Sequence, residues 1–181
     1  MTPIPSAPLS DALRYKRSRF TTRLPLDRRY TAAHVWLAPE AGATGAADRV
    51  WRIGFTKFAA RMLGEVVEFG FEVEPGGAVE LGAVIGWMEG FKASTDLYSV
   101  VDGTFVAANP GLTEHPERAH ADPYGEGWIY RVSGTPDPES VDAQGYAAIL
   151  DRAIDRIQGE AHAEEYTENE PDEDPACRPT K

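Results

Sequence analysis

The residue best suited to chemistry in this chain is Lys92, the one lysine in the stretch 58–180, with an acidic residue at short spacing on either side. Glu89 lies three residues before it and Asp96 four residues after it. Apolar, strand-like sequence flanks this group over residues 83–88 and again from residue 97, so we expect two strands with Lys92 at the turn between them. An amine on a rigid tip can be reached by another protein and can carry an attached group. The simpler interpretation is that Lys92 only keeps the end of a hairpin in water.

The residues around Lys92 favour the first interpretation. Residues 89–96 read Glu-Gly-Phe-Lys-Ala-Ser-Thr-Asp. This stretch resembles the lipoylation hairpin of the glycine cleavage system H protein, Glu-Ser-Val-Lys-Ala followed shortly by Ser-Asp. Residues 122–128, Asp-Pro-Tyr-Gly-Glu-Gly-Trp, resemble a second motif of that family, and residues 30–36 resemble its opening Tyr-Thr…His-Glu-Trp. The resemblance runs in the same order over residues 30–150.

The resemblance implies a mainly β fold, a barrel-sandwich hybrid of two small sheets with a short helix and a C-terminal helix. It also implies a carrier with lipoate attached to Lys92, and with Glu89 and Asp96 recognised by the modifying enzyme or contacting the arm. The arm would take an aminomethyl group from glycine decarboxylase to aminomethyltransferase and be reoxidised by dihydrolipoyl dehydrogenase. Lipoate ligase or a lipoyl or octanoyl transferase would attach it. The carrier is expected to be a monomer.

Biotin carriers share this fold, but they usually place methionines on both sides of the lysine. Here Phe91 and Ala93 occupy those positions, which favours a lipoyl group.

Two departures from the family pattern bear on the cargo. Val35 stands where the family has the glutamate that helps to shelter the aminomethylated arm, and valine cannot accept a hydrogen bond from an ammonium group. Gly90 and Phe91 replace the Ser-Val pair before the lysine. An H-like carrier of another cargo, such as sulfur intermediates or relayed lipoyl groups, therefore remains an alternative. An unmodified H-like binding module is a third hypothesis.

Composition argues against several other classes of protein. The 181-residue chain has a net charge of -11, which disfavours nucleic acid as a partner. It contains no apolar run of membrane-spanning length. Its one cysteine, Cys177, cannot form an intramolecular disulfide, so dithiol chemistry needs an attached group. The four histidines are scattered, and neither a zinc motif nor a phosphate-binding loop is present, so we do not expect an enzyme.

The sequence divides into three parts. Residues 1–29 contain several prolines and seven Lys or Arg against two Asp, and we expect a basic arm lying on the surface. A mitochondrial transit peptide is the alternative, so the expected location is the cytoplasm, with the mitochondrial matrix as second choice. Residues 30–159 are expected to form the carrier domain. Residues 160–181 are rich in Asp and Glu and are predicted to be a disordered acidic tail.

Local patterns predict the elements that position the site. A short helix is expected over residues 56–63, capped by Thr56 and ended by Gly64. Strict alternation predicts a strand over residues 65–74 with Val67, Phe69, Phe71 and Val73 on its buried face. Asp102-Gly103 predicts a hairpin turn. The stripe formed by Tyr146, Leu150, Ile154 and Ile157 predicts a C-terminal helix over residues 142–158 that packs on the core. His34 is expected to lie in a strand with Trp36 and to serve structure.

Overall fold

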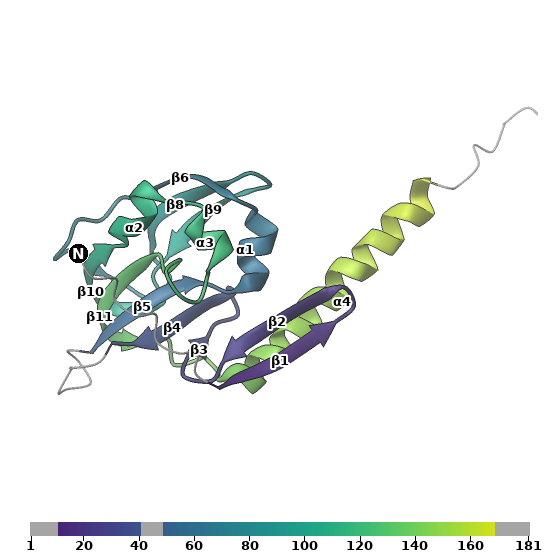
Figure 1. Ribbon diagram of the computed structural model, residues 1–181, viewed down its shortest axis with the longest axis horizontal. Coiled ribbons are helices and arrows are strands. Elements are labelled where there is room, and N and C mark those ends of the chain that lie inside the picture. The colour runs from purple at the N-terminus through teal and green to yellow at the C-terminus, as the bar shows by residue number, and fades with distance from the viewer. Residues whose placement is uncertain (1–10, 41–48, 169–181) are drawn as a thin grey trace, which may run out of the picture.

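The computed structural model describes residues 11–40 and 49–168 and confirms a mainly β architecture (Figure 1). The strands are β1 (Ala12–Arg17), β2 (Phe20–Pro25), β3 (Arg29–Tyr30), β4 (Val35–Pro39), β5 (Val50–Phe55), β6 (Val66–Phe71), β7 (Ala78–Val79), β8 (Val84–Gly90), β9 (Ser94–Tyr98), β10 (Val101–Ala108) and β11 (Tyr130–Pro136). The helices are α1 (Lys57–Leu63), α2 (Pro110–Glu114), α3 (Arg118–Ala121) and α4 (Ala143–Glu168). No helix in the described ranges is both long and apolar enough to cross a membrane.

Two antiparallel sheets enclose the main core. One has six strands in the order β3-β4-β5-β11-β10-β7, and the other has three in the order β6-β8-β9. Both sheets contribute to one buried cluster, which includes Ile53 and Val132 from the first sheet and Met88 and Leu97 from the second. Burial of such side chains contributes about 1.5–3 kcal/mol each to stability relative to exposure. The shared cluster therefore fixes β8 and β9, and with them Lys92, against the larger sheet.

Helix α1 has the predicted bounds and caps. The Thr56 side chain accepts a hydrogen bond from the Ala59 backbone N–H at 3.4 Å, and Gly64 ends the helix with a φ of 82°. Phe58 and Leu63 are buried on its inner side. The helix thereby connects the end of β5 to the region beside the β8–β9 turn.

Residues 12–25, which belong to the segment predicted as a basic surface arm (residues 1–29), form two paired strands. β1 and β2 pair as a hairpin, and Tyr15, Phe20 and Leu24 point inward to a second buried cluster with Tyr146 and Leu150 of α4. The residues between these buried positions are mostly Arg and Lys, so the segment was interpreted by its charge and not by its alternation of apolar and polar residues. The prediction of an arm that only lies on the surface is therefore corrected for residues 12–25, and residues 1–10 lie outside the described ranges.

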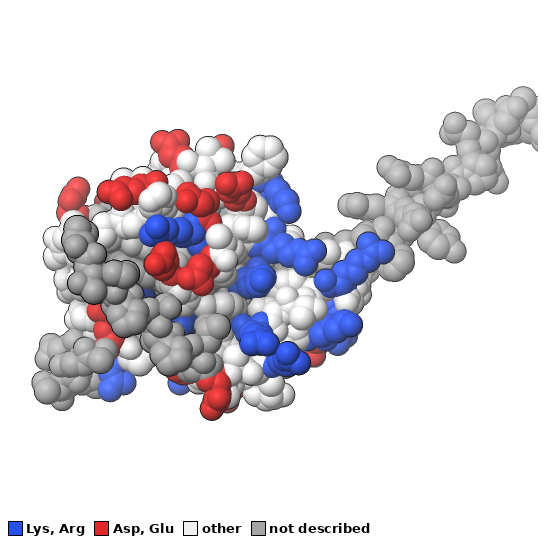
Figure 2. Space-filling view, in the orientation of Figure 1, with Lys and Arg blue, Asp and Glu red and all other residues white. Residues whose placement is uncertain are grey.

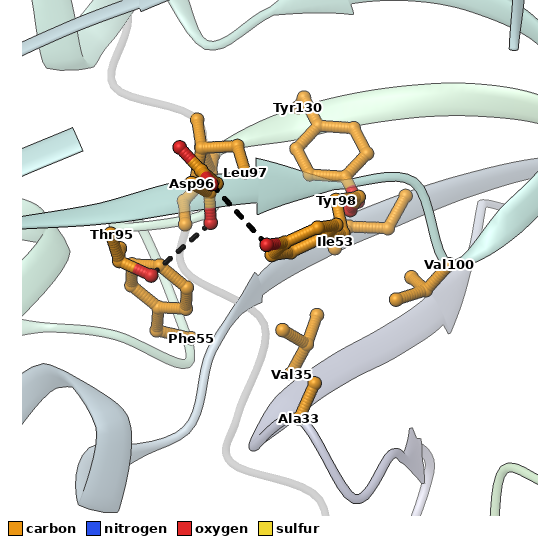
Figure 3. A pocket seen from close by; sticks show the side chains of 11 residues that line it. Ala33, Val35, Ile53, Phe55, Thr95, Asp96, Leu97, Tyr98, Val100 and Tyr130 are labelled. Atoms are coloured by element: carbon orange, nitrogen blue, oxygen red, sulfur yellow. Dashed lines mark hydrogen bonds between the residues drawn. The ribbon is translucent and has the colours of Figure 1, made fainter. Parts of the chain in front are cut away.

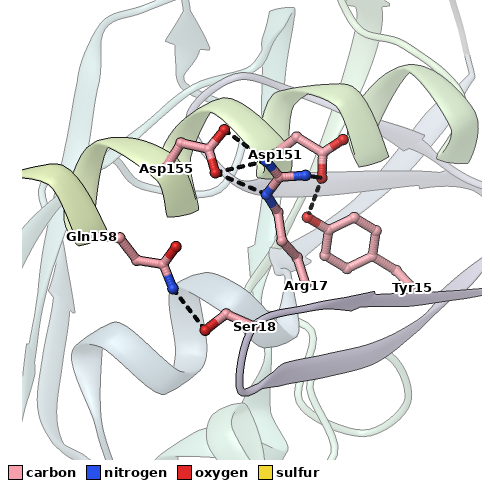
Figure 4. Close-up of polar contacts among 6 residues, drawn as sticks. All are labelled: Tyr15, Arg17, Ser18, Asp151, Asp155 and Gln158. Atoms are coloured by element: carbon pink, nitrogen blue, oxygen red, sulfur yellow. Dashed lines mark hydrogen bonds and ion pairs between the residues drawn. The ribbon is translucent and has the colours of Figure 1, made fainter.

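Polar contacts fasten the hairpin to α4 (Figure 4). The Tyr15 hydroxyl donates to Asp151 at 2.8 Å, and the Arg17 guanidinium binds both carboxylate oxygens of Asp155 at 2.7 Å. Gln158 donates to the Ser18 hydroxyl at 2.6 Å. Burial and the neighbouring Asp151 carboxylate raise the pKa of Tyr15 well above its ordinary value, so its hydroxyl stays protonated as a donor.

Helix α4 is longer than predicted. Tyr146, Leu150 and Ile154 are buried as expected, but Ile157 is exposed, and the helix continues to Glu168. Residues 160–168, predicted to be disordered, are therefore helical, since Ala and Glu in this stretch favour a helix. Residues 169–181, which include Cys177 and the rest of the acidic tail, lie outside the described ranges.

The hairpin predicted at Asp102-Gly103 is wrong. Both residues lie inside β10, where they pair with Thr135 and Gly134 of β11. Gly103 is required by close strand approach, because a Cβ there would overlap the Ser133 carbonyl oxygen. A glycine inside a strand often marks such an approach rather than a turn.

Two smaller predictions also needed correction. A bulge between Val66 and Glu68 interrupts the alternation of β6, so Val67 is exposed instead of buried. His34 precedes β4 and has a φ of 60°, so it lies in the turn and not in a strand with Trp36.

Candidate functional site

Lys92 lies in the short turn that joins β8 to β9, as predicted. It is exposed, and the adjacent Phe91 is 83% exposed, the highest value among the large apolar residues that the structure describes as exposed. A large ring left in water beside the only lysine of the turn is suited to contact another protein. The tip thus presents an amine and an aromatic ring together.

Backbone hydrogen bonds hold this tip rigidly. The Lys92 N–H donates to the Leu63 carbonyl at 3.0 Å, and the Phe91 N–H donates to the Glu65 carbonyl at 2.8 Å. Within the turn, the Gly90 N–H donates to the Ala93 carbonyl at 2.8 Å. The turn is therefore attached to the end of α1 and the start of β6 as well as to its own strands. A side chain on this base needs little additional ordering when a partner takes it up.

Gly90 makes this attachment possible. A Cβ at position 90 would overlap the Leu63 carbonyl oxygen and lie 2.5 Å from the Leu63 Cγ. The turn can approach the last turn of α1 only if residue 90 has no side chain. The departure from the family serine is thus explained by the local packing of this chain.

Glu89 and Asp96 lie on one face of the three-stranded sheet. Glu89 pairs with Ser94 across β8 and β9, and Asp96 pairs with Trp87, so all four side chains leave the sheet on the same side. Both carboxylates are exposed. The structure therefore brings the two predicted acidic residues to the surface next to the tip, where another protein can reach them.

Asp96 also lines a small cleft between β9 and the larger sheet (Figure 3). The cleft has a volume of about 150 Å³. Its lining residues are Ala33, Val35, Ile53, Phe55, Thr95, Asp96, Leu97, Tyr98, Val100, Ile129 and Tyr130. Figure 3 shows Ala33 and Val35 on one side of this space and Asp96 and Tyr98 on the other. The cleft is large enough for a small group, and Asp96 is the only residue with a charged side chain among those that line it.

The polar groups of the cleft are concentrated on β9. The Tyr98 hydroxyl donates to the Asp96 carboxylate at 3.3 Å, and the Tyr130 hydroxyl donates to the Tyr98 carbonyl at 2.6 Å. The opposite wall, with Val35, offers only apolar side chains. The sequence analysis identified Asp96 but missed Tyr98. Tyr98 follows Asp96 by two residues in the same strand, so the two side chains lie on the same face.

His34 serves structure, as predicted. Its Nδ1 lies 2.8 Å from the Tyr146 hydroxyl, which is also 2.8 Å from the Thr56 hydroxyl. Burial lowers the pKa of His34, so the ring is neutral at neutral pH. Within the described ranges no three His, Cys, Asp or Glu side chains gather as a metal site would require.

Comparison with known proteins identifies the same family that the sequence motifs resemble. The family model described as glycine cleavage H-protein matches residues 28–149. The glycine cleavage system H protein of Corynebacterium jeikeium is 39% identical over 127 residues, which is 70% of this chain and 97% of the relative. That of Thermus thermophilus is 39% identical over 132 residues, 71% of this chain and 96% of the relative.

A solved structure agrees with these relatives. The crystal structure of a glycine cleavage system H protein from Mycobacterium marinum has a TM-score of 0.61 and 34% identity, covering 69% of this chain and 97% of that one. The predicted barrel-sandwich fold of the lipoyl-carrier type is thereby confirmed. The chain belongs to the glycine cleavage H-protein family.

Proposed function

We propose that this chain carries a lipoyl group in amide linkage to the Nζ atom of Lys92. As a member of the H-protein family, the chain is a lipoyl carrier of the glycine cleavage system. The observation that supports Lys92 as the attachment site is its exposed position on a turn that is hydrogen-bonded to α1 and β6. When bound, the lipoyl group supplies a disulfide that opens to hold an aminomethyl group and closes again on reoxidation.

The protein's own residues would position and protect that arm. The rigid turn fixes where the arm starts, and the exposed Phe91 ring offers an apolar contact beside it. Glu89 and Asp96 present carboxylates on one face, for recognition by the attaching enzyme or for contact with the arm. Asp96, four residues after Lys92, also lines the cleft, which in this proposal receives the end of the arm.

The partners follow from this role. The aminomethyl group would come from glycine decarboxylase and pass to aminomethyltransferase, and dihydrolipoyl dehydrogenase would restore the disulfide. Lipoate ligase, or a lipoyl or octanoyl transferase, would attach the group. The chain acts in this scheme as a monomeric carrier and catalyses no step itself.

Intact-mass measurement and peptide mapping test the attachment site. Protein made together with an active lipoate ligase should gain one lipoyl group on the peptide that contains Lys92. The Lys92→Arg variant should gain none, and the matched Lys57→Arg variant should be modified like the wild type. Lipoate on another lysine, or an unmodified Lys92, would refute this assignment.

A second candidate function keeps the lipoyl arm but changes its cargo. The apolar wall formed by Ala33 and Val35 favours it, because neither side chain can accept a hydrogen bond from an ammonium group. Such a carrier would hold a sulfur intermediate or relay lipoyl groups. Loading of the lipoylated protein by glycine decarboxylase and labelled glycine separates the two candidates, since only the first predicts that label appears on the arm.

A further inference from the structure

The β1–β2 hairpin (Ala12–Arg17 and Phe20–Pro25) lies outside the part of the chain that matches the H-protein family, residues 28–149. Its inner face is buried on α4. Its outer face carries Arg14, Lys16, Thr21 and Arg23, all exposed. The inner face explains how the hairpin is held, and the outer face raises the question of what it contacts.

The outer face brings like charges together. Arg14 and Arg23 are direct partners across the two strands. Like charges in directly opposite positions destabilise a strand pair. Among the described residues no carboxylate forms an ion pair with either of them, whereas Arg17 on the inner side binds two aspartates. The repulsion between Arg14 and Arg23 lowers the stability of the hairpin. Binding of an external anionic group that neutralises the two arginines would therefore be favourable.

The two arginines line a groove together with Lys57, the first residue of α1. The groove, about 640 Å³, lies between the hairpin and residues 121–124. Asp11 and Asp122 also line it, so three cations and two carboxylates face the groove and its lining keeps a net charge of +1. Three cations from two separate elements thus face one open depression.

Helix α1 continues this positive surface toward Lys92. Arg61 is one helical turn beyond Lys57, on the same side of the helix, and its guanidinium lies 5.9 Å from the centre of the Phe20 ring. The carbonyl of Leu63, two residues later, holds the Lys92 N–H. We call Arg14, Arg23, Lys57 and Arg61 the basic stripe. Figure 2 shows blue side chains gathered over the hairpin and α1, while red ones gather over another part of the same face.

We propose that the basic stripe is a docking surface for a carboxylate-rich surface on an enzyme that acts on the arm at Lys92. We assign this role to the glycine decarboxylase, because in the proposed function it is the enzyme that loads the arm. This proposal rests on the proposed function. A protein partner fits better than nucleic acid, because the stripe has only four cations and leads to the exposed apolar side chain of Phe91. An extended phosphate backbone would run past the stripe onto the rest of a chain whose net charge is -11. A stripe that ends beside Lys92 would also orient the tip toward the enzyme's cleft, and lipoylation, which removes the Lys92 charge, leaves the stripe intact.

Steady-state kinetics of the lipoylated protein with its glycine decarboxylase test the proposal. The test variant is Arg14→Gln/Arg23→Gln. The matched control is Arg152→Gln/Arg156→Gln, which removes two exposed arginines from α4 and changes the net charge equally. We expect KM for the test variant to rise about tenfold at low salt with kcat unchanged, and the difference to shrink as salt is added. The control should behave as the wild type, and the melting temperature of the test variant should not fall.

Each other outcome refutes the proposal in a distinct way. Equal KM values for test and control variants, with an active wild type, would leave the proposed function standing and remove the docking surface. A wild type that is lipoylated but not used by the decarboxylase would refute the proposed function, and the docking proposal with it. Loss of binding to a duplex oligonucleotide in the test variant, with KM unchanged, would assign the stripe to nucleic acid instead.

Discussion

Replacing Val35 with glutamate should lengthen the lifetime of an aminomethyl group carried on Lys92. Val35 pairs with Phe55 in the larger sheet and is 9% exposed. It lines the apolar wall of the cleft, across from Asp96 (Figure 3). A carboxylate introduced there would give an ammonium group in the cleft a second acidic partner, on the wall that now has none.

The expected size of the effect follows from the shelter that the cleft provides. A hydrogen bond to a charged group contributes about 1.5–3 kcal/mol when it is sheltered from water. Since about 1.4 kcal/mol corresponds to a factor of ten, the loaded state would live about ten to a hundred times longer. The cleft is small and mostly apolar but open, so we expect the lower end of this range.

The assay measures the release of formaldehyde and ammonia from the loaded protein. Wild type, Val35→Glu and Val35→Gln would be lipoylated, loaded by glycine decarboxylase, separated from the enzyme and followed over time. Val35→Gln is the matched control, because glutamine has nearly the same shape as glutamate but carries no charge. We expect a large effect for glutamate and a small one for glutamine. The unloaded glutamate variant should also melt at a lower temperature, since its carboxylate then lies in an apolar wall without a cation.

Two results would refute this reasoning. If wild type and Val35→Glu lose their cargo at the same rate, the wall that contains Val35 does not face the aminomethyl group, and Asp96→Asn would then show whether the opposite wall shelters it alone. If wild type cannot be loaded at all, the aminomethyl cargo is excluded and the carrier of another cargo takes its place.

Three further predictions concern the rest of the fold. Gly90→Ser, which restores the family residue, should destabilise the protein by about 1–3 kcal/mol or more in denaturant unfolding, because its Cβ would overlap the Leu63 carbonyl; wild-type stability would contradict this. Truncation after Gln158 should leave the melting temperature nearly unchanged, since the contact with Ser18 is retained, and a drop of many degrees would show that the removed part packs on the body. His34 has a lowered pKa when folded, so the unfolded chain binds more protons below pH 6.5, and stability should fall as pH drops from 6.5 through the folded pKa; His34→Asn, which tolerates the positive φ, should flatten this part of the profile.

Much of the site could be predicted because its signals are local. Thr56 and Gly64 mark the ends of α1 through backbone requirements that act over a few residues. Lys92 falls at the turn because apolar sequence resumes on both sides of it. The family motifs then give the order of the strands and the role of the tip.

The missed features depend on contacts between distant segments. Gly103 looks like a turn residue, yet it lies where β10 approaches Ser133 of β11. The inward positions of the β1–β2 hairpin are convincing only once α4 is seen to cover them, more than 100 residues later in the chain. Sequence reasoning had no means to pair Arg17 with Asp155, and it took the basic residues as a sign of an arm.

The structure gives different explanations for the two departures from the family pattern, Gly90 and Val35. From the sequence alone, both bear equally on the question of cargo. Gly90 is explained by the approach of α1 to the tip: the Lys92 N–H bonds to the Leu63 carbonyl, and the same carbonyl leaves no room for a side chain at position 90. That substitution concerns how the tip is fastened and carries no information about cargo. Val35 belongs to the main buried cluster, but it also lines the cleft, into which a longer side chain could extend. The question of cargo therefore depends on Val35, and this is why the lifetime of the loaded arm in Val35→Glu is the decisive measurement.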